Sequence, residues 1–243
     1  MQAMIFAAGL GTRLKPLTDR MPKALVPVCG KPLLAHTIER LKGAGADEIV
    51  VNVHHFSQQI VDYLATHDFG IRIKISDESD RLLDTGGGLR KALPLFSRQD
   101  KPVLIHNVDI LSNIPLEDFY ASHQENDATL LVSERQTSRY LLFDDKDRLV
   151  GWTNISTGEV KTPYKDLDVA SCRRYAFSGI HCFSPRLGRL MTDLPDKFSI
   201  IDFYLSVCDK AVIKGHFQKD LRLLDVGKLD SLEQAEAFLE GII

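Results

Sequence analysis

MIFAAGLGTR, residues 4–13, places a short apolar run directly before a glycine-rich and basic loop. The apolar part, residues 4–8, predicts a buried strand, because an unbroken apolar run suits the interior of a parallel sheet. Glycines after such a strand let backbone N–H groups face a phosphate, since no side chain holds the ligand away. We therefore predict an anion-binding loop here. Its residues are Ala8, Gly9, Gly11 and Thr12.

Two well-known phosphate-binding patterns do not fit this loop. A P-loop needs Gly-Lys-Ser/Thr at the end of its spacing, and the segment has none. A dinucleotide fingerprint needs glycine or alanine where Leu14 stands, because that position packs a helix against the strand. The segment does supply Arg13, followed ten residues later by Lys23. Pro22 restricts the backbone before Lys23 and so limits where the ammonium group can lie.

Strand and helix patterns alternate with short gaps along the first 110 residues, which is typical of a mostly parallel sheet covered by helices. The second half is less regular, and residues 151–173 show little periodicity. We expect that stretch to be an excursion over the active-site side, since long irregular loops are usually functional. Ser231 and Gln234 have capping-box spacing and predict the start of a closing helix. The predicted strands are 4–8, 48–53, 71–75, 103–108, 128–132, 140–143 paired with 148–150, 175–183 and 221–224, and the other predicted helices are 33–41, 60–64 and 89–95.

A longer stretch, AAGLGTRLKPLTDRMPKALVPVCGKPLL from residue 7 to 34, carries a family resemblance. It resembles the N-terminal signature of the sugar-phosphate nucleotidylyltransferases: a Gly-x-Gly-x-Arg loop, then Pro-Lys-x-Leu-x-Pro and Gly-x-Pro. The resemblance implies a three-layer α/β/α fold with a mostly parallel, Rossmann-like central sheet, of nucleotide-diphospho-sugar transferase type. It also implies that a nucleoside triphosphate and a sugar 1-phosphate are converted to an NDP-sugar and pyrophosphate. The loop, Arg13 and Lys23 would then hold the triphosphate, with Arg13 and Lys23 in catalytic roles.

Two aspartates follow predicted strands, Asp109 after residues 103–108 and Asp225 after residues 221–224. Ligands gather at the carboxyl ends of strands in open α/β sheets, so these positions can converge. Each aspartate could instead simply cap the next segment. The resemblance favours the first reading and implies that both bind Mg²⁺, with Asn107 beside the nucleotide. Val108 departs from the glycine common in relatives.

The chemistry that the resemblance implies needs no general base. A phosphate monoester is largely ionised at neutral pH and can attack directly. The enzyme's task is then positioning and charge neutralisation, for which an oxygen-liganded divalent cation is well suited. This agrees with the absence of any Ser-His-Asp or Cys-His set in the sequence. His54 and His55 are adjacent, so in a strand they would point to opposite faces.

Residues 84–88, Asp-Thr-Gly-Gly-Gly, predict close backbone approach to a ligand, because three consecutive glycines are costly in conformational entropy. With Leu83 and residues 91–94 they resemble N-acetylmuramate-1-phosphate uridylyltransferases, which implies that Thr85 and Gly86 meet the base. Gly179 fits the strand glycine that holds the acceptor sugar in relatives. The relatives' Glu-Lys pair after the hairpin is missing. Possible substitutes are Asn154, Glu159 and Lys161.

Several functions stay open. The leading interpretation is UTP-dependent transfer to N-acetylmuramate 1-phosphate, as in cell-wall sugar recycling, and the alternative is GTP-dependent transfer to mannose 1-phosphate. A phosphocholine cytidylyltransferase would need a cage for a quaternary ammonium, to which Trp152 could contribute. A nucleotide sensor without catalysis would not need Arg13, Lys23, Asp109 and Asp225 together.

Composition limits the remaining possibilities. The chain has 243 residues and a formal net charge of −3, so we expect one domain, with a nucleotide half near 1–110 and an acceptor half near 111–243. The one basic stretch suits a small polyanion better than nucleic acid. Four scattered cysteines and the lack of any long apolar run predict a cytoplasmic protein with no membrane contact. We expect a monomer or a small homo-oligomer.

Overall fold

The computed structural model describes residues 1–241 and places the N-terminal apolar run inside a ten-stranded sheet. This strand, β1 (Gln2–Phe6), pairs in parallel with β4 (Glu48–Val53) and β6 (Val103–Asn107), and β4 pairs in parallel with β5 (Arg72–Asp77). The central part of the sheet is therefore parallel, as predicted. Its strands all end at one edge, so the loops that follow them lie close together.

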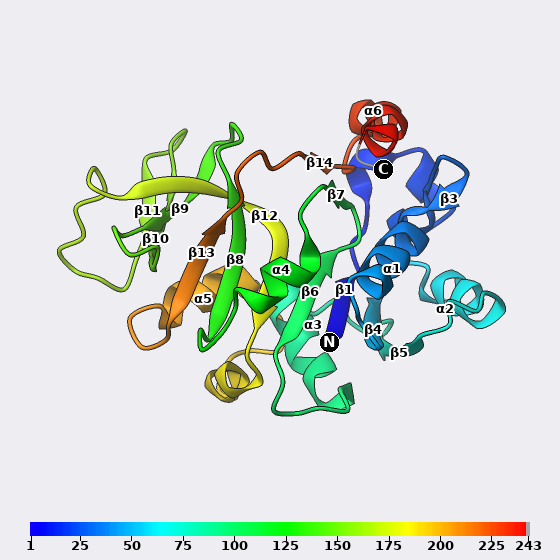
Figure 1. Cartoon of the computed structure of the whole chain (residues 1–243), viewed down its shortest axis with the longest axis horizontal. Helices are drawn as coiled ribbons and strands as arrows, with labels where there is room; N and C mark the ends of the chain where they lie inside the picture. The colour runs from blue at the N-terminus through cyan, green and yellow to red at the C-terminus, as the bar shows by residue number, and fades with distance from the viewer. Residues whose placement is uncertain (242–243) are drawn as a thin grey trace.

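Helices cover both faces of the sheet. Side chains alternate along β1, so that Ala3 and Ile5 belong to one apolar core and Met4 and Phe6 to another. Residues of α1 (Leu33–Gly43), α2 (Ser57–Thr66), α4 (Leu116–Ala121) and α6 (Leu229–Glu240) complete the first core. Residues of α3 (Asp84–Ala92) and α5 (Ile200–Val207) complete the second. This is the predicted three-layer α/β/α fold (Figure 1).

Antiparallel strands extend the sheet beyond β6. The long strand β12 (Arg173–Phe183) pairs with β6, with β8 (Ala128–Ser133) and with β9 (Arg139–Phe143). The predicted hairpin is confirmed as β9 and β10 (Leu149–Asn154), and β11 (Glu159–Lys161) adds to it at the left of Figure 1. The expectation of an irregular excursion from residue 151 is therefore wrong at its start, because this stretch is paired. β13 (Ile213–Phe217) lies parallel to β8.

Short elements complete the chain. Helix α6 begins at Leu229 rather than at Ser231, whose hydroxyl donates to the Lys228 carbonyl oxygen instead of capping, so the predicted capping box is wrong. A two-stranded ribbon, β7 (Ile110–Ser112) with β14 (Leu223–Asp225), lies beneath α6. The remaining elements are β2 (Pro27–Val28), β3 (Lys31–Pro32) and the 3-10 turns η1 (Thr12–Leu14), η2 (Leu17–Asp19), η3 (Lys23–Leu25), η4 (Leu93–Leu95) and η5 (Pro185–Met191).

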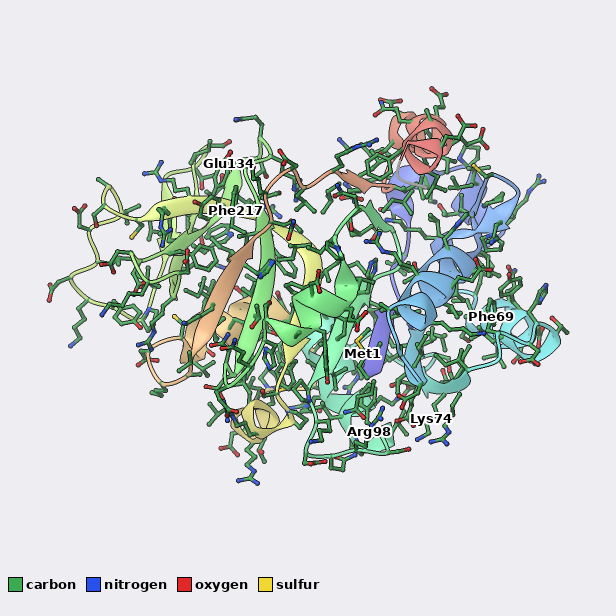
Figure 2. The ribbon with its side chains drawn as sticks, viewed as in Figure 1. Met1, Phe69, Lys74, Arg98, Glu134 and Phe217 are labelled. Carbon is green, nitrogen blue, oxygen red and sulfur yellow. The ribbon has the colours of Figure 1, made fainter. Side chains whose placement is uncertain are left out.

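Ion pairs close the edge at which the parallel strands begin. Figure 2 shows Met1, Lys74 and Arg98 together at this edge. Lys74 donates to the buried carboxylate of Glu48 at 2.6 Å, and Arg98 pairs with Asp47. The charged groups here are paired with one another. Two adjoining cavities lie at the opposite edge of the sheet. Within residues 1–241, no helix combines the length and apolar composition that a membrane span requires.

Candidate active site

Two cavities adjoin where the parallel strands end. The loop cavity, about 470 Å³, is lined by the glycine-rich loop after β1 together with Lys23, Asn107 and Asp109. The hairpin cavity, about 680 Å³, is lined by β9, β10, β11 and α5, with Asp225 at its border. Arg13 lines both cavities. The predicted residues that line the loop cavity are Ala8, Gly9, Gly11, Thr12, Arg13, Lys23, Thr85, Asn107 and Asp109.

The glycine-rich loop is held in one conformation by its own contacts. Gly11 has a φ of +63°, which favours glycine, and a Cβ there would lie 2.8 Å from the Thr18 methyl group. Thr18 also donates its hydroxyl to the Gly11 carbonyl oxygen at 2.8 Å. The Ala7 N–H donates to the Asn52 side chain at 2.8 Å, which anchors the start of the loop. The conformation of the glycine-rich loop is therefore largely fixed by the chain itself.

A pair of buried polar side chains that the sequence did not reveal fixes this anchor. Asn52 donates to Glu78 at 2.7 Å, and the Leu83 N–H donates to the other Glu78 oxygen at 3.1 Å. Glu78 is fully buried, and burial raises the pKa of its carboxyl group. The only signal in the sequence was a polar asparagine within the otherwise apolar part of β4. This pair couples the loop after β1 to the segment before α3.

A cation and two carboxylates meet at the border of the cavities. Lys23, only 8% exposed, forms an ion pair with Asp109. Burial and the charge of Asp109 raise the pKa of Asp225, and the opposing charges of Lys23 and Arg13 do not cancel that rise. The buried Oδ1 of Asp225 has no hydrogen-bond partner among residues 1–241. A buried carboxylate oxygen without a partner, facing a second carboxylate, suits an additional cation.

The route that brings Asp225 here differs from the predicted one. The prediction placed it at the end of a strand in the central sheet, but β14 pairs with β7 outside that sheet. Asp225 is in register with Ile110, the residue after Asp109. The Val226 N–H donates to the Asp109 carbonyl oxygen at 2.8 Å. The ribbon therefore brings the two carboxylates together.

The structure gives the three glycines a reason other than the predicted approach to a ligand. A Cβ at Gly86 would overlap the ring of Phe198, one at Gly87 would overlap the Asp196 carbonyl, and one at Gly88 would lie 2.7 Å from Glu78. Gly86 does not line the loop cavity, although Thr85 does. The close approach that these glycines allow is made by the chain itself. A role for Gly86 in contacting a base therefore has no support in this geometry.

The hairpin cavity is lined by four cationic side chains and three carboxylates. Arg13, Arg135 and Arg139 have no carboxylate within 4 Å among the described residues. Lys161 differs, because it pairs with Asp202 at 3.1 Å and lies 5.3 Å from the centre of the Trp152 ring. Asn154, Glu159 and Lys161 line this cavity, whereas the other predicted sugar-side residue, Gly179, lines neither cavity. Gly179 has a φ of +75° and packs against Asn107.

The profile of the family described as Nucleotidyl transferase matches residues 2–150, more than half of the chain. The chain belongs to the Nucleotidyl transferase family. The matched region of this nucleotidyl transferase contains Arg13, Lys23 and Asp109. It ends before Asp225 and before much of the lining of the hairpin cavity.

Curated relatives and solved structures agree with this assignment. N-acetylmuramate alpha-1-phosphate uridylyltransferase of Neisseria meningitidis serogroup B is 46% identical over 125 residues, 51% of this chain and 52% of the relative. That of Caulobacter vibrioides is 46% identical over 110 residues, 44% of this chain and 45% of the relative. Mannose-1-phosphate guanyltransferase of Gibberella zeae is 37% identical over 145 residues, 58% of this chain and 40% of the relative. The match thus spans about half or less of each relative.

Solved structures share the fold over almost the whole chain. HddC from Yersinia pseudotuberculosis has a TM-score of 0.77 at 22% identity, covering 98% of this nucleotidyl transferase and 99% of that chain. The inositol-1-phosphate CTP transferase from T. maritima has a TM-score of 0.79 at 16% identity, covering 99% and 95%. At these identities the likeness concerns the fold alone. It confirms the nucleotide-diphospho-sugar transferase type of architecture.

Proposed function

We propose that the protein is a nucleotidylyltransferase that joins a sugar 1-phosphate to a nucleoside triphosphate and releases pyrophosphate. The observation that carries this proposal is the meeting of two cavities at one group of charged residues. Arg13 lines both cavities, and Lys23, Asp109 and Asp225 lie at their border. Two polyanions that must react with one another need such a shared boundary. Family membership supports the same activity.

In this proposal the loop cavity holds the triphosphate and the hairpin cavity holds the acceptor. Backbone N–H groups of residues 9–12 and the guanidinium of Arg13 bind the phosphates. A phosphate oxygen of the acceptor attacks the α-phosphorus, a new P–O bond forms, and the bond to pyrophosphate breaks on the opposite side. The acceptor phosphate is already ionised, so no residue needs to remove a proton. One continuous unit does this work, with a nucleotide half near 1–110 and an acceptor half near 111–243.

We propose Mg²⁺ as the cofactor. Asp109 and Asp225 would hold it, since both are carboxylates and the buried Asp225 oxygen lacks a partner within residues 1–241. No group of three or more potential ligand side chains occurs in that range. Mg²⁺ commonly completes its coordination with water and substrate oxygens. When bound, the cation neutralises charge on the phosphate oxygens. Lys23 supplies a further positive charge beside Asp109.

We propose N-acetylmuramate 1-phosphate and UTP as the substrates. N-acetylmuramate carries a carboxylate in addition to its 1-phosphate, whereas mannose 1-phosphate carries only the phosphate. The unpaired Arg135 and Arg139 favour an acceptor with this second negative charge. The two relatives at 46% identity are uridylyltransferases that are named for this sugar. GTP with mannose 1-phosphate is the second candidate, supported by the guanyltransferase relative.

The other two functions have less support. A quaternary ammonium would need an open aromatic face, and the Lys161 ammonium already lies over the ring of Trp152. A cation there would also repel choline. A nucleotide sensor would not need two carboxylates and two cations at the border of a second, larger cavity. These observations weigh against phosphocholine transfer and against a purely sensing role.

A pyrophosphate-release screen tests the proposal. Each of the four nucleoside triphosphates is combined with N-acetylmuramate 1-phosphate, N-acetylglucosamine 1-phosphate, mannose 1-phosphate and phosphocholine in the presence of Mg²⁺. We expect the highest kcat/KM for UTP with N-acetylmuramate 1-phosphate. N-acetylglucosamine 1-phosphate is the matched control, because it lacks the carboxylate. Nucleotide binding without pyrophosphate release from any pair would overturn the catalytic proposal, and preference for GTP with mannose 1-phosphate would establish the second candidate.

A further inference from the structure

Residues 195–199, here named the bridging segment, contribute to both cavities although they lie more than 100 residues from Gly86 and Gly87, which they contact. Lys197 lines the loop cavity, and Ser199 lines the hairpin cavity. The segment connects η5 to α5 and has no regular secondary structure over most of its length. Its position therefore depends on contacts with the rest of the chain.

Backbone hydrogen bonds fix the bridging segment to α3. The N–H groups of Gly86 and Gly87 donate to the Phe198 carbonyl oxygen at 2.9 and 3.3 Å. The Phe198 N–H donates to the Leu83 carbonyl oxygen at 3.2 Å. The Thr85 hydroxyl accepts a hydrogen bond from the Ile200 N–H at 2.9 Å. The residues that directly follow Lys197 are thus tied to the start of this helix.

Arginine side chains fix the outer part of the segment. Arg90 donates to the Leu194 carbonyl oxygen at 2.8 Å and to that of Pro195 at 3.1 Å, and its guanidinium lies 5.3 Å from the centre of the Phe198 ring. Arg81 also pairs with Asp196. The three glycines of α3 leave the space into which Phe198 and the Asp196 backbone pack. A side chain at Gly86 or Gly87 would displace the segment that carries Lys197.

Charge shows what Lys197 is available to bind. Three cationic side chains line the loop cavity: Arg13, Lys23 and Lys197. Lys23 is paired with Asp109. Lys197 has no carboxylate within 4 Å and no hydrogen-bond partner among residues 1–241, and its side chain is exposed to the cavity. An unpaired ammonium held by a fixed backbone opposite an anion-binding loop suits a phosphate ligand.

We propose that Lys197 binds phosphate oxygens of the nucleoside triphosphate, and that Gly86 and Gly87 serve to position it. This inference rests on the proposed function, because that function places the triphosphate in the loop cavity. It assigns the phosphate contact to the acceptor half of the chain, so the triphosphate is held from both sides. It also gives the glycine cluster a role that does not involve the base.

Equilibrium binding of UTP and UMP with Mg²⁺, in the absence of acceptor, tests this proposal on the full chain. Lys197→Gln should weaken UTP binding about tenfold, equivalent to about 1.4 kcal/mol. It should weaken UMP binding less, because UMP has fewer phosphate oxygens for Lys197 to contact. Lys197→Arg should restore most of the affinity. Lys210→Gln, an exposed lysine that lines neither cavity, is the matched control and should bind UTP as the wild type does.

A second variant tests the positioning role. Gly86→Ala should weaken UTP binding because Phe198 must move. The double variant Gly86→Ala/Lys197→Gln should have the same UTP affinity as whichever single variant binds UTP less tightly. Wild-type UTP affinity in Lys197→Gln, or equal loss for UTP and UMP, would overturn the proposal. Turnover is measured separately. If Lys197→Gln loses UTP affinity but the wild-type protein transfers to no acceptor, the proposed function alone is overturned. If Lys197→Gln binds UTP and turns over normally, only this inference is overturned.

Discussion

The loop cavity and the hairpin cavity share a border but differ in how their charges are arranged. The loop cavity is lined by the glycine-rich loop after β1, and its buried cation Lys23 is matched to Asp109. In the hairpin cavity, Arg135 and Arg139 are unmatched within the described residues. Under the proposed function a triphosphate takes part in every reaction considered, so a preformed loop is enough for it. Under the same function the acceptor must be distinguished from similar sugars, which requires unpaired side chains that bind a particular charged group of the acceptor.

The difference predicts two kinds of variant. Changes in the loop cavity and at its border should lower the rate for every substrate pair, because those residues meet groups that all nucleotides and sugar phosphates share. Changes in the hairpin cavity should alter the choice among acceptors. Both expectations depend on the proposed activity. The variants below test them in order of decreasing effect.

The largest effect is expected from the two carboxylates. Asp109→Asn or Asp225→Asn should lower kcat about a thousandfold for every substrate pair, the kinetic equivalent of about 4 kcal/mol, because each removes one charge from the proposed Mg²⁺ site. Steady-state kinetics over a range of Mg²⁺ concentrations provides the measurement. Glu117→Gln, an exposed acid on α4, is the control. Near-normal turnover in either aspartate variant would remove that residue from the metal site.

Lys23→Ala should lower kcat about a hundredfold, since a buried cation beside the reacting phosphates is lost. Its pairing with Asp109 adds a consequence that the sequence did not suggest. Without Lys23 the charges of Asp109 and Asp225 oppose each other more strongly, so the free energy of unfolding should fall by about 1 to 2 kcal/mol without Mg²⁺.

The control is Lys15→Ala, which breaks an exposed ion pair with Asp19 and should change little. Thermal unfolding with and without Mg²⁺ separates the two roles of Lys23. Mg²⁺ should restore most of the stability of Lys23→Ala, because the ion supplies the missing charge. If stability stays low at saturating Mg²⁺ while turnover is normal, Lys23 is a structural partner of the acids and nothing more.

The loop cavity was largely predictable from the sequence because its chemistry is local. A strand, two glycines, Arg13 and Lys23 occur within one short stretch, and the alternation of strand and helix patterns predicted a mostly parallel sheet around it. Asp109 directly follows a predicted strand. These are features of neighbouring residues, so no tertiary contact has to be known.

The rest depended on contacts between distant segments. No local pattern indicates that Phe198 packs onto Gly86, that Glu78 binds Asn52, or that Arg139 and Asp225 line one cavity. The glycine cluster was correctly recognised as a place of close approach, but the partner was a chain segment rather than a ligand. A glycine pattern shows that space is needed without showing what fills it.

Arg139→Gln should lower kcat/KM about tenfold for N-acetylmuramate 1-phosphate and leave N-acetylglucosamine 1-phosphate nearly unaffected, since only the first carries a carboxylate. The KM for UTP should not change. Lys146→Gln, in the turn of the same β9–β10 hairpin but outside the cavity, is the matched control. Equal losses for both acceptors would mean that Arg139 binds the phosphate common to them.

Asn154→Ala and Glu159→Gln should have smaller effects. The two residues face each other in the β10–β11 pairing and line the hairpin cavity. We expect about a threefold change in preference among sugar 1-phosphates, in line with the loss of one neutral hydrogen bond, and no change among triphosphates. Competition assays with mixed acceptors and mixed triphosphates measure both preferences. A shift in the choice of triphosphate would contradict the division of labour between the cavities.

The smallest effect concerns stability at the border itself. Burial and Asp109 raise the pKa of Asp225, so the folded state favours its protonated form. The stability that this group contributes is therefore greatest at acidic pH and is lost as the pH rises through the raised pKa. Without Mg²⁺ at pH 7, Asp225→Asn should raise the free energy of unfolding by on the order of 0.5 kcal/mol. The advantage should shrink as the pH falls toward the ordinary value of 3.8.

Glu48 provides the opposite case at the other edge of the sheet. Its burial disfavours the charged form, but hydrogen bonds from Lys74 and Ser97 outweigh it, and the net pKa is lowered. Glu48 therefore stabilises the fold above its ordinary value of 4.5, and that contribution is lost as the pH falls through the lowered pKa. Glu48→Gln should be less stable than the wild type at pH 7, measured by urea unfolding beside Asp225→Asn. If both variants lost stability at pH 7, Asp225 would be a paired structural residue, and the border of the two cavities would carry no unbalanced charge for a cation to relieve.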